Sequence, residues 1–181
     1  MYKFNKKHLV FVLISFFSIN SNSNEYSGSP LNLIQDLEGV YKFQFSSSIV
    51  TGEKYQSEDI IEIVKYSDDA IYFRVKLNFE NDHRCNIYGI AKYNNGSFIY
   101  KEKSNSLPQQ ACTLKIRPEN NVLKLSDLNE DSDSTCISYC SARGTLSSYQ
   151  IGLERKRKIK YMPIILKSAE YQSSVDEYNK K

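Results

Sequence analysis

The sequence predicts a mainly β protein: an antiparallel up-and-down barrel of about eight strands with a C-terminal α-helix. Three observations favour this fold class. Aromatic residues make up 13% of the chain, which favours β structure. Apolar and polar residues alternate strictly over residues 71–79, as in a half-buried antiparallel strand. Short turns join successive strands, and closing eight of them into a barrel removes exposed edges. An open sandwich is the alternative.

Residues 1–23 are predicted to be a signal peptide. Lysines without acids precede an apolar run of 11 residues, Leu9–Ile19, and small residues follow it. This run is shorter than the roughly 20 residues of a membrane-spanning helix. We therefore expect cleavage near Asn24, a periplasmic or secreted location, and no stable membrane insertion after cleavage. An uncleaved N-terminal anchor is the alternative.

The net charge of +3 describes the precursor. Removing the three lysines of the signal peptide leaves the mature chain near neutrality, so no nucleic-acid partner is expected. Charge is segregated locally instead. Residues 127–133 carry four acids, and residues 155–160 carry five bases. We expect the basic run to be a solvated edge beyond the barrel rim; binding of phosphate or anionic lipid is the alternative.

Residues 24–36 are rich in Ser and Asn and are expected to form a flexible leader, followed by a single barrel domain over residues 37–181. The first strand begins at Gly39, with aromatic residues on one face. The most regular strand has five inward-facing apolar residues: Ile71, Phe73, Val75, Leu77 and Phe79. Its other face is polar, which predicts that this face is exposed to solvent.

Asn95-Gly96 predicts a tight hairpin, because a type I′ turn requires positive φ at both central residues. Asn94 is then expected to pair with Ser97. In this register Gly89 and Ala91 lie on the inner face. These small residues would leave room for a ligand unless aromatic side chains fill it, and the candidates are Phe43, Phe73, Phe79, Tyr93 and Phe98. The sequence leaves open whether the interior is filled or hollow.

Further strands are expected over residues 112–116, 122–126 and 146–153. The basic run 155–160 could extend the last of them. Ser168 is a candidate N-cap for the C-terminal helix, in which Tyr171, Val175 and Tyr178 have helical spacing.

All four cysteines lie in the exported part: Cys85, Cys112, Cys136 and Cys140. An even number in an oxidising compartment predicts two disulfides, whose pairing the sequence leaves open. A metal site is the alternative, but spacings of 27, 24 and 4 residues match no zinc pattern with paired C-x2-C motifs. We therefore predict no metal site.

No catalytic residue is predicted. His83 is the only histidine of the mature chain, and it lies in a polar loop without a Gly-x-Ser-x-Gly motif. The pattern Asp127-x-Asn129-x-Asp131-x-Asp133 resembles the start of a calcium loop, but Ser132 and Ser138 replace its Gly and Glu. No spacing singles out a pair of carboxylates for glycoside hydrolysis. No phosphate-binding loop is present, and no cofactor is expected.

Gly39-x-Tyr41, the eight strands and the C-terminal helix are similar to lipocalin-like barrels, which usually have Trp at the position of Tyr41. The segment Cys136-x-x-x-Cys140-Ser-Ala-Arg-Gly144 resembles an uncharacterised family of small exported bacterial proteins. Export, small size and disulfides also resemble periplasmic lysozyme inhibitors. These resemblances imply a β-barrel that is cross-linked by disulfides.

We therefore expect an exported, non-catalytic binding or inhibitor protein, whose partner is another protein, such as a cell-wall hydrolase of the lysozyme type. The candidate binding loop contains Ser141, Arg143 and Gly144. The alternative for Arg143 is an ion pair with an acid of residues 127–133. A lipocalin-like carrier of a small apolar ligand and an unrecognised hydrolase are the alternative functions.

Overall fold

The computed structural model describes residues 29–103, 111–129 and 131–180. The predicted signal peptide lies outside these residues. The described helices and strands are, in chain order, α1 (Pro30–Leu37), β1 (Gly39–Ser48), β2 (Lys54–Lys65), β3 (Ala70–Asn78), η1 (Glu80–Asp82), β4 (Arg84–Asn94), β5 (Ser97–Lys101), β6 (Thr113–Glu119), β7 (Val122–Ser126), η3 (Ile137–Tyr139), β8 (Gln150–Gly152), η4 (Leu153–Arg155), β9 (Lys156–Arg157), α2 (Met162–Leu166) and α3 (Ala169–Asn179).

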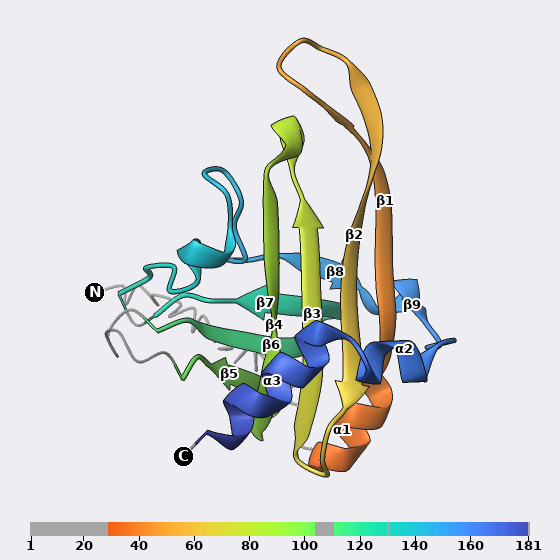
Figure 1. Ribbon diagram of the computed structural model, residues 1–181, viewed down its shortest axis with the longest axis vertical. Coiled ribbons are helices and arrows are strands. Elements are labelled where there is room, and N and C mark those ends of the chain that lie inside the picture. Colours follow the sequence, from red (N-terminus) through yellow and green to blue (C-terminus); the bar gives the residue numbers. More distant parts are fainter. Residues whose placement is uncertain (1–28, 104–110, 130, 181) are drawn as a thin grey trace, which may run out of the picture.

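Nine antiparallel strands form one sheet in the order β8-β7-β6-β5-β4-β3-β2-β1-β9, which curls into a nearly closed barrel (Figure 1). The predicted barrel is confirmed, with nine strands where about eight were expected. The difference lies in the last predicted strand, residues 146–153. Only Gln150–Gly152 pairs with β7, and the chain then turns through η4 before β9 pairs with β1. The two edge strands are therefore neighbours along the chain.

The β4–β5 hairpin has the predicted register. Asn94 pairs with Ser97, and Lys92 pairs with Ile99. Asn95 and Gly96 have φ values of 44° and 73°, which is the left-handed region that a type I′ turn requires. The pairing of β4 with β5 ends at Lys92 and Ile99, and beyond this pair the two strands separate.

The barrel interior is filled with side chains. Ile71, Phe73 and Val75 of β3 are fully buried in one apolar cluster, as their alternation predicts. The Phe73 ring lies 5.4 Å from that of Tyr100. A Cβ atom added to Gly89 would lie 2.5 Å from the Tyr100 ring. Of the two outcomes that the sequence left open, a hollow or a filled interior, the space beside Gly89 is therefore filled, by Tyr100.

The expectation of a flexible leader over residues 24–36 is wrong for its described end, because residues 30–37 form α1. The Ser29 hydroxyl accepts a hydrogen bond from the Asn32 amide, and Pro30 occupies the first turn, where its missing N–H is not needed. The helix buries three apolar residues in the barrel cluster: Leu33, Ile34 and Leu37. The Tyr41 hydroxyl donates to the Leu37 carbonyl at 2.9 Å. This burial overrides the polar composition of the segment.

The outer face of β3 is not fully solvated, contrary to its polar sequence pattern. Tyr72 is fully buried, and its ring packs edge to face with Tyr171 of α3 at 4.9 Å. Arg74 pairs with Glu62 at 2.6 Å and with Glu170 at 3.3 Å. Helix α3 lies across this face of the sheet in Figure 1. The polar residue Arg74 of this strand therefore forms ion pairs beneath α3 and is not solvated as its pattern predicted.

The C-terminal helix itself begins as predicted. The Ser168 hydroxyl accepts a hydrogen bond from the Tyr171 amide, which satisfies one of the free N–H groups of the first turn. The Ser174 hydroxyl donates to the Glu170 carbonyl and is buried against the sheet.

A pair of leucines on α1 tests whether this helix closes the barrel. Leu33→Ala should lower the free energy of unfolding by about 2–5 kcal/mol, because it leaves a cavity in the core. Leu31 is 36% exposed on the same helix, so Leu31→Ala should cost less than about 1 kcal/mol. Chemical denaturation of both variants measures the difference. Equal losses would mean that α1 is not docked in the core.

Candidate functional site: a disulfide-anchored rim

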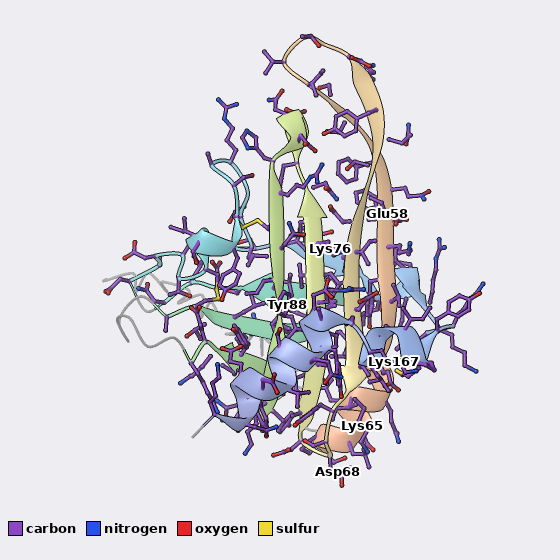
Figure 2. The ribbon with its side chains drawn as sticks, in the orientation of Figure 1. Glu58, Lys65, Asp68, Lys76, Tyr88 and Lys167 are labelled. Atoms are coloured by element: carbon purple, nitrogen blue, oxygen red, sulfur yellow. A yellow bond between two sulfur atoms is a disulfide. The ribbon has the colours of Figure 1, made fainter. Side chains whose placement is uncertain are left out.

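Two disulfides join the irregular segment 136–144 to the sheet. Cys85, at the start of β4, is bonded to Cys140, and Cys112, just before β6, is bonded to Cys136. Cys136 and Cys140 flank the single turn η3, so both ends of this turn are covalently fixed (Figure 2). The predicted disulfides are confirmed. They indicate an oxidising environment, periplasmic or extracellular.

Ser141 and Gly144, two residues of the candidate binding loop, hold the loop in place. The Ser141 amide donates to the Arg84 carbonyl, and the Arg84 amide donates to the Ser141 hydroxyl, each at 2.8 Å. A Cβ atom on Gly144 would lie 2.8 Å from the Cys85 sulfur. Only glycine therefore fits this close against the disulfide. Both residues are explained by loop geometry.

Arg143 is the third residue of the predicted loop, and it is exposed. Within the described ranges its guanidinium forms no ion pair or hydrogen bond. The alternative, an ion pair with an acid of residues 127–133, is not seen among the described residues of that loop. Asp127 is instead buried and accepts hydrogen bonds from the Ser147 hydroxyl at 2.6 Å and the Cys136 amide at 3.1 Å. Arg143 therefore remains available to an external acid.

A polar cleft of about 350 Å³ adjoins η3. It is lined by Tyr88, Tyr100, Glu102, Lys103, Tyr139, Ser173, Glu177 and Lys180. Sequence reasoning missed this cleft because its residues come from β4, β5, η3 and α3, and no spacing connects them. The disulfides help to form this cleft, because they fix both ends of η3, and Tyr139 of η3 lines the cleft.

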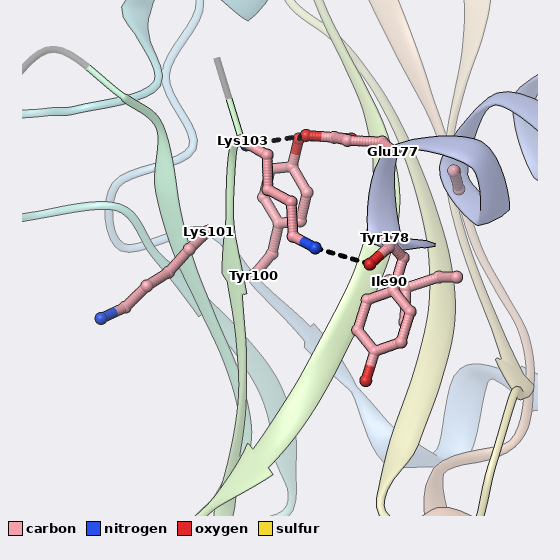
Figure 3. A pocket seen from close by; sticks show the side chains of 7 residues that line it. Ile90, Tyr100, Lys101, Lys103, Glu177 and Tyr178 are labelled. Atoms are coloured by element: carbon pink, nitrogen blue, oxygen red, sulfur yellow. Dashed lines mark hydrogen bonds between the residues drawn. The ribbon is translucent and has the colours of Figure 1, made fainter. Parts of the chain in front are cut away.

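Tyr100 passes through the barrel wall where β4 and β5 separate. Its ring packs on Phe73 inside, whereas its hydroxyl lies 3.2 Å from both carboxylate oxygens of Glu177 on α3. Glu177 also accepts a hydrogen bond from the Lys103 amide at 3.0 Å (Figure 3). The end of α3 is thereby fixed over the opening between the two strands.

The second carboxylate of the cleft is equally engaged. Glu102 accepts from the Tyr139 hydroxyl at 2.8 Å and from the Cys112 amide at 3.0 Å. Burial, followed by the hydrogen bond to Glu102, raises the pKa of Tyr139 to about 12. Burial likewise raises the pKa of Tyr100. Both phenols are therefore neutral donors at physiological pH, and they orient the two carboxylates as acceptors.

His83 lies beside the same loop. Its Nδ1 atom is 3.3 Å from the Ser141 hydroxyl, and the residue is half-buried. A nucleophilic serine requires a histidine base that a third group orients. Among the described residues no carboxylate is hydrogen-bonded to His83. The Ser141 hydroxyl oxygen also accepts a hydrogen bond from the Arg84 amide, which gives this serine a structural role.

No protein-family model, curated protein or solved structure gives a significant match to this chain. In the described ranges, helices are too short or too polar to cross a bilayer. Nor do the described His, Cys, Asp and Glu side chains form a group of three or more that could hold a metal ion.

Removing the disulfides tests how the segment is held. The native protein should lack four hydrogens relative to its reduced mass, because both bridges are formed. Replacing either pair by serine, in Cys85→Ser/Cys140→Ser or Cys112→Ser/Cys136→Ser, should lower the free energy of unfolding by about 2–5 kcal/mol. Mass spectrometry and denaturant titration measure these effects. Four free thiols in the exported protein would contradict the assignment.

Proposed function

We propose that this protein is an exported, non-catalytic binding protein that inhibits a cell-wall hydrolase through its disulfide-anchored rim. The observation that carries the proposal is Arg143: an exposed arginine without an internal partner among the described residues, on a loop that a disulfide, Ser141 and Gly144 hold. An arginine on a fixed loop is suited to recognising a carboxylate.

The energetic argument rests on pre-organisation. A loop that is already fixed loses little conformational entropy on binding, so more of its contact energy appears as affinity. The planar guanidinium donates a fork of hydrogen bonds that matches a carboxylate. Glycoside hydrolases of the lysozyme type use a pair of carboxylates in their cleft. Arg143 inserted there would pair with these acids and exclude the substrate.

The packed interior favours this function over a carrier of an apolar ligand. A carrier needs an internal cavity, and the inner face around Gly89 is filled by Tyr100. Helix α1 adds three apolar side chains to the same core. A ligand would have to displace several buried side chains to enter.

A hydrolase remains the second alternative, on one observation: the contact between His83 and Ser141. Against it, the Ser141 hydroxyl accepts a hydrogen bond from the Arg84 amide, and among the described residues no carboxylate orients His83. The carboxylates of the neighbouring cleft accept structural hydrogen bonds. Any hydrolytic activity of the protein should disappear in Ser141→Ala if this alternative holds.

Arg143→Ala tests the proposal with purified muramidases as probes. The oxidised protein should inhibit peptidoglycan hydrolysis by one of them, and Arg143→Ala should weaken the inhibition about 30-fold or more, as truncation of a central arginine does at interfaces. Thermal melting should be unchanged because Arg143 is exposed. Inhibition kinetics and calorimetry measure both quantities.

Lys167→Ala is the matched control. Lys167 is exposed and lies away from the disulfides in Figure 2, so its loss should leave inhibition unchanged. Equal inhibition by wild type and Arg143→Ala, or a loss that follows unfolding, would reject the role of the rim. Absence of inhibition of every muramidase tested would reject the proposed partner.

A further inference from the structure

A second cleft, of about 480 Å³, lies on the outer face of the barrel between β1–β3 and the segment that connects β9 to α2. Its lining combines cationic residues with apolar ones. Val40, Ile159 and Ile165 are among the apolar residues, and Arg157, Lys158 and Lys160 supply charge from one side. The proposed inhibitory role does not use this surface.

The cations of this cleft divide into two groups. Lys42 and Arg74 are neutralised, because Lys42 pairs with Glu58 at 2.8 Å and Arg74 pairs with two glutamates. Arg157, Lys158 and Lys160 are exposed, and their side chains form no hydrogen bond or ion pair with residues of the described part. The charge of Arg157 also acts on Glu58, whose carboxyl pKa it helps to lower. Three positive charges within four positions therefore lack a hydrogen-bonded or ion-paired partner in the described part.

Two large apolar side chains are exposed beside these charges. Tyr161 and Ile164 are each 67% exposed, although both line the same cleft. Solvent exposure of such side chains brings no stability to the fold. Tyrosines gather at the boundary between lipid headgroups and hydrocarbon, and basic residues beside exposed apolar ones are typical of surfaces that lie on a membrane.

We propose that the segment 157–164 is a peripheral membrane-binding surface that recognises the phosphate of anionic phospholipids. Arg157 offers a forked donor to a phosphate, and the two lysines supply point charges. Tyr161 and Ile164 enter the region between headgroups and acyl chains. A free phosphate ion would use only the cations, whereas a bilayer engages the apolar pair as well.

The position of this surface permits the contact. β9 and α2 lie at the right edge of the molecule in Figure 1, and the disulfide-anchored segment lies at the left. A bilayer that touches β9 and α2 therefore leaves the rim facing the solution. Basic residues near an anionic surface each strengthen binding about fivefold, so the three together predict an effect of about 100-fold.

Vesicle flotation of the oxidised, exported protein tests this inference. The protein should bind vesicles made of equal parts phosphatidylglycerol and phosphatidylcholine, and bind weakly to phosphatidylcholine alone. Raising the salt concentration to ~1 M should release it, because the Debye length then falls to about 3 Å. Arg157→Gln/Lys158→Gln/Lys160→Gln should weaken binding about 100-fold, and Tyr161→Ser/Ile164→Ser should weaken it while keeping the salt dependence.

Lys54→Gln/Lys76→Gln/Lys101→Gln is the control, since it removes the same charge from exposed lysines elsewhere on the molecule. It should retain most of the binding. An equal loss in this control would show that only net charge matters and would overturn the inference. So would equal affinity for neutral vesicles, tight binding of inorganic phosphate without vesicle binding, or capture of an acidic peptide by the same residues in place of vesicles.

Discussion

Covalent attachment of the segment 136–144 to the sheet is the constraint on which the candidate site depends. This segment contains one turn of 3₁₀ helix, which has too few hydrogen bonds to hold a position by itself. Its two bonds to β4 and to the residue before β6 replace the missing secondary structure. The same attachment places the Tyr139 hydroxyl against Glu102. Both side chains line the polar cleft whose other wall is formed by α3. Arg143 thus lies on a loop whose backbone is held by the Cys85–Cys140 disulfide.

The filled interior separates this barrel from one that carries ligands. Side chains from the sheet and from α1 form a single cluster, and Tyr100 occupies the space above Gly89. Tyr100 also connects the core to the surface, because its hydroxyl leaves the barrel between β4 and β5 and meets Glu177. A barrel whose described interior is filled with side chains presents recognition residues on its outside and at its rims. Both surfaces to which we assign binding are of this kind.

The sequence predicted elements whose signals are local. Alternation over residues 71–77 identified the inner face of β3, and Asn95-Gly96 identified a turn whose register is correct. The helix α1 was missed because Ser and Asn dominate its surroundings, although Leu33, Ile34 and Leu37 have helical spacing after a Ser-Pro start. The cleft and the burial of Tyr72 and Arg74 depend on contacts between distant segments, which no local pattern encodes. Of the predicted loop, Ser141 and Gly144 have structural roles, and Arg143 carries the proposal of binding.

Amide hydrogen exchange of residues 137–144 tests most directly whether the disulfides fix the rim. In the oxidised protein the Cys140, Ser141 and Gly144 amides donate to backbone carbonyls, so they should exchange slowly. After mild reduction they should exchange much faster, while the amides of β3 and β4 stay protected by the core. Equal exchange before and after reduction, or loss of protection throughout the barrel at once, would contradict the account of a separately anchored rim.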